Sequence, residues 1–392
     1  MYKPSSLQDI YLPGTFHLEA GQNTAVDHDH HHHHHHQRYR QRDWFRQQRG
    51  DVYHVNGSLL SSQHPHGLDS QWGGSFPTGE FCGAVFWLKL NQRLHRLDPY
   101  NETFTGEIER EVYNEGLAHL DWGGNGIRYF SFLNGVKSEP QQISTCCEGQ
   151  GTRLYGSLQE YMFSTTPNYD TLFFDIYAPS SFTAISGLNA TVDTLFPYGT
   201  AVSISLSFST PGSSLVLALR IPAWVAAPSV SVMVDGKAWG ELGLPGSYLL
   251  ISAPPSGWPL GSTLVSFSLP MAFKAHLYTG ITQIEPFTRY GFTYGPILMA
   301  ALPQTWNSTL KSLHIPGVDG NNPAKWAVPS IDSHPAHFDV LGVPGITFMP
   351  NWEVRVGPSS FLSIYTHQHS HFLSPPHKNC HCHALFSTDS TS

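Results

Sequence analysis

The stretch Thr145–Tyr161 constrains the fold more than any other part of the chain. Thr145 is followed three positions later by Glu148, a capping-box pattern that predicts a helix beginning at this point. Cys146 and Cys147 then occupy the first two helical positions, where unpaired N–H groups and the helix dipole favour thiolate over thiol. Adjacent cysteines here are poor disulfide partners because their side chains diverge. The pair is suited to binding a soft metal or supplying a nucleophile, although two small buried residues would give the same pattern.

A second segment, Gly79–Cys82, opens another run of apolar residues at helical spacing. The run continues with Val85, Phe86, Leu90, Leu94 and Leu97. Glu80 and Cys82 are two positions apart and would face different sides of a regular helix. At a helix start, where the backbone is not yet regular, both side chains can turn toward one point. If the two helix starts meet, Glu80, Cys82, Cys146 and Cys147 form a set of one carboxylate and three sulfurs, which zinc accepts in tetrahedral geometry.

Four short segments carry a family resemblance, namely Glu80 to Cys82, Tyr113-Asn114, Cys146 to Tyr161 and Leu219 to Trp224. Together they resemble glycoside hydrolase family 127, the β-L-arabinofuranosidase-type enzymes, over roughly residues 60 to 365. The cysteine segment is the most specific part of this resemblance.

The resemblance implies a zinc-thiolate retaining glycoside hydrolase that acts on arabinofuranoside-like glycans. By it, Glu80, Cys82, Cys146 and Cys147 hold Zn²⁺, and Cys146 is also the nucleophile. A thiolate among such ligands stays deprotonated yet electron-rich enough to attack an anomeric carbon.

A retaining hydrolase also needs a general acid near the glycosidic oxygen. In the family this acid is a glutamate shortly before the Glu-x-Cys element. The corresponding stretch here, Ser62–Gly73, contains no glutamate, and its only carboxylate belongs to Asp69. Asp69 is therefore the candidate acid, with an ordinary loop aspartate as the alternative.

The charge balance narrows the choice of partners. The formal net charge of −8 argues against a nucleic acid or an anionic membrane and fits a neutral glycan better. No run of eighteen apolar residues is present, so we expect no membrane span. No signal peptide is visible after Met1, and the sequence leaves localisation and oligomeric state open.

The expected fold is α+β multidomain, with a partial (α/α)6 toroid followed by an antiparallel β-sandwich. The resemblance implies a ring of twelve helices, of which about three are recognisable, so the toroid reads as truncated on its N-terminal side. We expect five regions: a low-complexity, His-rich segment over 1–57, the partial toroid over 58–166, the sandwich over 167–303, a small β-unit over 304–366 and a disordered tail over 367–392.

Two other functions compete with the glycosidase hypothesis. In the first, the chain is non-catalytic: the β-sandwich binds carbohydrate or protein, and zinc is purely structural. In the second, the chain sequesters metal ions through its histidine tract, which ends at His36, and through the Cys380–His383 cluster.

Overall fold

The structure is a computed structural model. It describes residues 78–121, 126–131, 134–137, 139–140, 145–183, 187–277, 287–303, 313–315, 317–355, 359–361 and 363–367. Within these ranges no helix is both long enough and apolar enough to cross a membrane.

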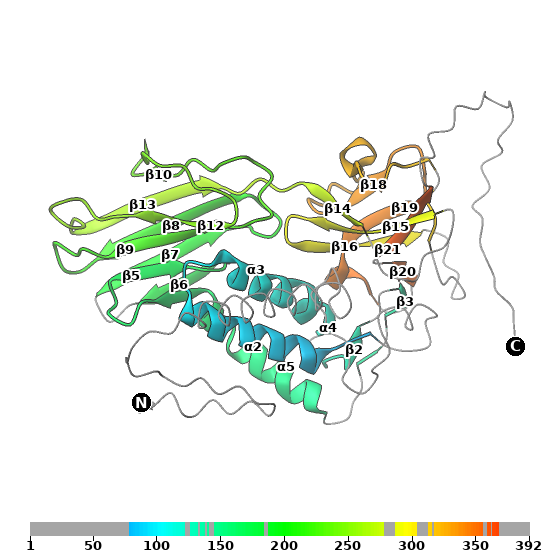
Figure 1. The fold of residues 1–392 in the computed structure, drawn as a ribbon, viewed down its shortest axis with the longest axis horizontal. Helices are drawn as coiled ribbons and strands as arrows, with labels where there is room; N and C mark the ends of the chain where they lie inside the picture. Colours follow the sequence, from blue (N-terminus) through cyan, green and yellow to red (C-terminus); the bar gives the residue numbers. More distant parts are fainter. Residues whose placement is uncertain are drawn as a thin grey trace, which may run out of the picture. The chain divides into compact units, whose positions relative to one another are not determined.

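Three helical segments pack against one another near the start of the described chain (Figure 1). Helix α2 spans Phe81–Leu97 and helix α5 spans Cys146–Gly156, which a 3-10 turn, η5 (Leu158–Tyr161), follows. The remaining segment is continuous and consists of α3 (Glu102–Arg110), the π-helical η4 (Glu111–Gly116) and α4 (Leu117–His119).

The buried face of α2 runs from Phe81 through Val85 and Leu88 to His95, at spacings that keep these side chains on one side of the helix. The sequence pattern places Phe86 and Leu97 in the apolar run of this helix, but the structure does not bury either side chain. Phe86 is 56% exposed and Leu97 is 79% exposed, because both positions fall outside this stripe. Polar residues complete the buried face in their place.

Tyr113-Asn114, one of the segments that carry the family resemblance, lies in the π-helical turn η4. Asn114 is fully buried, and its amide clamps a neighbouring strand. Its Nδ2 donates to the Pro296 carbonyl at 2.8 Å, and its Oδ1 accepts from the Leu298 N–H at 2.8 Å. The side chain therefore has a structural role, since it joins the helices to the β-structure.

Two sheets enclose one apolar core and form what we call the two-sheet unit. The six-stranded sheet, in spatial order, contains β11 (Lys237–Ala238), β10 (Met233–Val234), β13 (Gly261–Ser268), β8 (Ala201–Phe208), β7 (Leu188–Thr194) and β6 (Ser180–Thr183). The four-stranded sheet contains β12 (Ser247–Ile251), β9 (Val216–Ile221), β5 (Thr171–Phe174) and β4 (Phe163–Thr165).

The pairing in this unit departs from the expected antiparallel arrangement at one place. Strands β5 and β9 are parallel, with Leu172 opposite Leu217. Elsewhere the alternation of β8 puts Val202, Ile204 and Leu206 into the core, as its sequence predicts.

A third sheet follows in the sequence. Its main path, in spatial order, is β14 (Phe273–Leu277), β15 (Phe287–Tyr294), β16 (Ile297–Pro303), β19 (Ile346–Pro350), β18 (Phe338–Val340) and β17 (Ala327–Pro329). Three more strands join it, β3 (Asn134–Val136), β20 (Ser359–Phe361) and β21 (Ser363–His367). The expected boundary at residue 303 thus falls inside a sheet, because β16 pairs with β19.

The remaining elements are short. Strands β1 (Thr78–Glu80) and β2 (Phe130–Ser131) form a two-stranded sheet, and η6 (Pro323–Lys325) and η7 (Asn351–Glu353) are 3-10 turns. The helices share an apolar core with the third sheet, in which Phe81 and Leu88 belong to the same cluster as Phe292 and Phe348.

A buried ionic cluster joins α3 to the two-sheet unit. Arg220 of β9 is 0% exposed and lies 2.8 Å from Glu102 and 3.0 Å from Glu109, both on α3. Trp224 donates to the same Glu109 carboxylate at 2.7 Å, and the Arg220 Nη1 donates to the Asp175 carbonyl at 3.1 Å. The segment Leu219–Trp224 is therefore the contact through which α3 docks.

Replacing Arg220 with Met is expected to lower the free energy of unfolding by about 3–5 kcal/mol, because two buried carboxylates lose their counter-charge. Arg93→Met, at an exposed position of α2, is the matched control and should cost less than about 0.5 kcal/mol. Urea unfolding followed by circular dichroism measures both. Equal stabilities of the two variants would contradict a structural role for the cluster.

Glu111 of η4 is 1% exposed, and neither of its carboxylate oxygens has a hydrogen-bond partner among the described residues. Burial raises its pKa well above the usual value, and the neighbouring carboxylates of Glu115 and Glu107 raise the pKa further. A carboxyl whose pKa is higher in the folded than in the unfolded state binds its proton more tightly when folded. Its contribution to stability is therefore lost as pH rises through the folded pKa.

Glu111→Gln is thus expected to leave stability nearly unchanged at pH 4 and to raise it at pH 8, where the unfolded wild-type carboxyl is ionised. Urea unfolding at the two pH values, with the exposed Glu241→Gln as control, tests this expectation. A Glu111→Gln effect that is the same at both pH values would show that Glu111 does not titrate differently on folding.

Candidate active site

The structure confirms the capping box at the start of α5. The Thr145 hydroxyl accepts from the Glu148 N–H at 3.2 Å, and the Glu148 carboxylate accepts from the Thr145 N–H at 3.0 Å. Cys146 and Cys147 are therefore the first two residues of the helix, as the sequence predicts. Glu80 is the last residue of β1 and the N-cap residue of α2. Its backbone is extended, so the direction of its side chain is not set by the helix.

The backbone of Tyr129 and Phe130 contacts both helix starts. The Phe81 N–H donates to the Tyr129 carbonyl at 3.1 Å, and Glu80 pairs with Phe130 in the β1–β2 sheet. The Cys147 Sγ lies 3.8 Å from the same Tyr129 carbonyl oxygen. One residue of this segment thus contacts both helix starts.

Close packing between the helices requires a glycine on α5. A Cβ built on Gly151 would lie 2.6 Å from the Ile127 side chain and 2.7 Å from that of Phe81. Both distances are too short for a carbon–carbon contact, so glycine allows α5 to approach the first turn of α2.

The four residues predicted to bind metal lie in one cluster. One ligand atom each from Glu80, Cys82, Cys146 and Cys147 can be chosen so that all four lie within 4.8 Å of one another. The sulfurs of Cys82 and Cys147 are 3.2 Å apart, and all three cysteines are free thiols. Three sulfurs and one carboxylate form a donor set that suits Zn²⁺.

The three thiols have different environments. Burial raises the pKa of Cys147 to about 11, and burial followed by hydrogen bonding with Cys147 raises the pKa of Cys82. The pKa of Cys146 is lowered, first by hydrogen bonding with Cys82 and then by hydrogen bonding with Tyr129. Cys146 is also the exposed member of the set. The accessible thiol is therefore the one that ionises most easily.

Tyr129 is a contact that the sequence reasoning missed. Its hydroxyl donates to the Glu80 Oε1 at 3.2 Å and lies 3.7 Å from the Cys146 Sγ. In the sequence Tyr129 is one apolar residue of a strand-like run, and nothing in that pattern marks it as a site residue. Its position follows only from the pairing of β1 with β2.

Several candidate residues lie outside the described ranges. They include the candidate acid, the histidine tract and the Cys-His cluster of the tail, namely Asp69, His28, His30–His36 and Cys380–His383.

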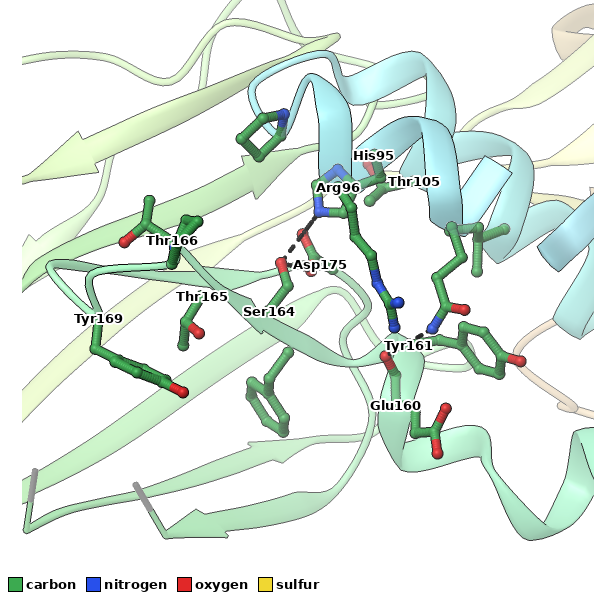
Figure 2. Close-up of a pocket in the computed structure, with 15 residues that line it drawn as sticks. His95, Arg96, Thr105, Glu160, Tyr161, Ser164, Thr165, Thr166, Tyr169 and Asp175 are labelled. Carbon is green, nitrogen blue, oxygen red and sulfur yellow. Dashed lines mark hydrogen bonds and ion pairs between the residues drawn. The ribbon is translucent and has the colours of Figure 1, made fainter. Parts of the chain in front are cut away.

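A cavity of about 460 Å³ lies elsewhere, at the end of α2 beside η5 and β4 (Figure 2). None of the four cluster residues lines it. His95, Ser164 and Asp175 meet in its wall, with the His95 Nε2 3.1 Å from the Ser164 hydroxyl and 3.3 Å from the Asp175 carboxylate.

This trio differs from a nucleophilic triad. In such a triad the serine and the carboxylate contact opposite ring nitrogens of the histidine. Here both contact Nε2, and the Ser164 hydroxyl donates to Asp175 at 2.6 Å. Tyr248 donates to the other Asp175 oxygen at 2.7 Å. Asp175 therefore serves as a structural acceptor between α2 and the two-sheet unit.

Comparisons with known proteins agree with the resemblance seen in the sequence. The family model for the catalytic domain of GH127 β-L-arabinofuranosidases matches residues 55–160, and the model for the GH127 middle domain matches residues 171–271. Together the two matches cover more than half of the chain. No curated protein sequence gives a significant match.

Solved structures show the same fold. A GH127 β-L-arabinofuranosidase from Geobacillus stearothermophilus T6 matches with a TM-score of 0.61 and 19% identity, covering 81% of this chain and 55% of that one. A GH127 β-arabinofuranosidase matches with a TM-score of 0.61 and 15% identity, covering 80% and 54%. A glycoside hydrolase matches with a TM-score of 0.58 and 13% identity, covering 81% and 60%. The chain thus spans a little over half the length of these proteins.

Two matched domains of one family, in the order in which they follow one another along the chain, identify this protein as a member of glycoside hydrolase family 127.

Proposed function

We propose that this chain is a zinc-thiolate retaining glycoside hydrolase that acts on arabinofuranoside-like glycans. The observation that carries the proposal is the meeting of one carboxylate and three sulfurs at two helix starts that are far apart in the sequence. The matched GH127 domains and the β-L-arabinofuranosidase activity named for a solved structure of the same fold support it.

In this proposal Glu80, Cys82, Cys146 and Cys147 hold the zinc ion. Its chemistry is to keep the sulfurs deprotonated in a site where two of them are buried. The donor set fits such an ion because buried thiols in contact are otherwise difficult to ionise, as the raised pKa values of Cys82 and Cys147 indicate.

Cys146 is the proposed nucleophile because it is the exposed sulfur of the set. Its Sγ forms a bond to the anomeric carbon while the bond from that carbon to the leaving oxygen breaks, and a carboxylic acid protonates the leaving oxygen. Water then attacks the same carbon, the carbon–sulfur bond breaks, and the carboxylate takes the proton from water. Two inversions give net retention of configuration. Asp69 is the proposed acid and base.

Tyr129 is proposed as a positioning residue for this chemistry. Its hydroxyl contacts both the carboxylate of Glu80 and the sulfur of Cys146. The hydroxyl donates to Glu80 and accepts from the Cys146 thiol, so it links the accessible sulfur to the carboxylate.

Cys146→Ser is expected to lower the rate of hydrolysis of a 4-nitrophenyl β-L-arabinofuranoside by at least about 1,000-fold, because a serine hydroxyl in place of a thiolate is a far weaker nucleophile. The matched control is Cys380→Ser, which removes a cysteine outside the cluster and should keep the wild-type rate. Released 4-nitrophenol measures both.

If wild type and Cys146→Ser hydrolyse the glycoside equally slowly, the glycosidase proposal fails for this chain. The competing function, a non-catalytic protein with a structural zinc ion and a carbohydrate- or protein-binding β-sandwich, would then take its place.

A further inference from the structure

We infer a second divalent-metal site, formed by His334, His337 and Glu353 on the third sheet. His334 and His337 lie in the loop Ser330–His337 between β17 and β18, and Glu353 is the last residue of η7. The site shares no residue with the cysteine cluster, so it does not depend on the proposed function.

The ligand atoms already face one another. The His337 Nε2 is 2.8 Å from one Glu353 oxygen, and the His334 Nε2 is 3.7 Å from the other. One ligand atom from each of the three residues lies within 4.8 Å of the other two. Two imidazole nitrogens and a carboxylate oxygen are a donor set that Zn²⁺ binds with three protein ligands, which leaves a fourth position for water.

The charges in this cluster also favour a cation. The two imidazole rings are tilted against each other with their centroids 4.0 Å apart. Two carboxylates flank the His337 ring, Asp332 at 2.5 Å and Glu353 at 2.8 Å. Their combined negative charge favours a cation at this point, and a dication between the two rings and Glu353 would match it without placing a positive charge on both rings.

A second carboxylate orients His337. The Asp332 Oδ2 is 2.5 Å from the His337 Nδ1, which places a proton on Nδ1 and keeps Nε2 facing Glu353. In the metal-free protein Nε2 donates to the Glu353 carboxylate at 2.8 Å, and a bound metal ion would take the place of that proton. This carboxylate–histidine arrangement is what metal-binding histidines usually have behind them. Asp332 also accepts from the His334 backbone N–H at 2.9 Å, so one side chain shapes the whole loop.

Glu353 is held in a similar way from the two-sheet unit. The Tyr198 hydroxyl, in the loop after β7, donates to the Glu353 Oε1 at 2.5 Å and accepts from the Trp352 Nε1 at 3.1 Å. Glu353 is thus fixed before a cation binds. A cation at this point would tie the β17–β18 loop to η7 and, through Tyr198, to the two-sheet unit.

One contact opposes binding at His334. The Ala336 N–H donates to the His334 Nδ1 at 3.4 Å, and this contact is lost when Nδ1 carries the proton and Nε2 binds metal. At 3.4 Å the hydrogen bond is long and therefore weak. The cost is small beside a bond between the imidazole and a dication.

The experiment follows the two histidines one by one in the full-length protein. Diethyl pyrocarbonate modifies imidazole nitrogens, and peptide mass spectrometry reads each histidine separately, so metal bound elsewhere on the chain does not interfere. The side chain of His334 is 34% exposed and is the main reporter. Labelling rates are measured without metal and during titration with Zn²⁺ until the rates stop changing.

Zinc is expected to slow labelling of His334 at least about tenfold, because a site held at ten times its Kd is empty less than a tenth of the time. Glu353→Gln should remove this protection, and Glu241→Gln, an exposed residue of the two-sheet unit, should retain it. Circular dichroism confirms that the variants are folded.

Unchanged labelling of His334 in wild type at saturating Zn²⁺ would overturn the inference and leave the cluster as an ion-paired network only. Equal protection in wild type and in folded Glu353→Gln would overturn it as well. If Glu353→Gln does not fold, the wild-type comparison decides the matter together with His337→Ala, which should also abolish protection of His334.

Discussion

The candidate active site depends on one backbone contact between segments that are distant in sequence. The Tyr129 carbonyl accepts from Phe81, the first residue of α2, and also lies against Cys147 at the start of α5. Helix starts expose unpaired N–H groups and the positive end of a dipole, which favour negative charge at this point and oppose the burial that raises the pKa of Cys82 and Cys147. This contact, together with the close packing at Gly151, keeps the carboxylate and the three thiols in one cluster.

The helices that carry the cluster are fixed to the rest of the chain by two other buried polar contacts. Arg220 pairs with two carboxylates of α3. The Asn114 side chain donates to the Pro296 carbonyl just before β16 and accepts from the Leu298 N–H within it. Both contacts lie where water cannot replace a lost partner, so each specifies one arrangement of the helices against the sheets. These contacts hold in place the helices whose starts carry the four-residue cluster.

The parts of the fold and of the candidate site that depend on neighbouring residues could be predicted from the sequence. The capping box of Thr145 and Glu148, the position of the two cysteines at a helix start, and the alternating strand Ala201–Phe208 all depend on neighbours a few residues apart, and the structure confirms them. An Asp-Gly pair between two strand-like segments predicts a hairpin turn. In the structure the Asp235-Gly236 turn joins β10 and β11, with φ values of 49° and 75°.

What the sequence did not predict depends on long-range pairing. The parallel pair β5–β9 and the membership of β14 to β16 in the third sheet depend on which strands meet in space. The contacts of Tyr129 with Glu80 and Cys146 follow from the β1–β2 pairing. The cluster of His334, His337 and Glu353 likewise joins a hairpin loop to a 3-10 turn. No spacing rule over a single segment identifies such contacts.

The most direct test of the central claim is the optical spectrum of the protein loaded with Co²⁺ in place of zinc. Thiolate ligands give an intense near-ultraviolet charge-transfer absorption that histidine and carboxylate ligands do not. In a chain with Cys380 and Cys382 changed to Ser, this absorption should saturate at about one Co²⁺ per chain, in line with one four-ligand site. It should weaken when Cys82 is also changed to Ser. Absence of the band, or a band of equal strength in the Cys82→Ser variant, would contradict the account.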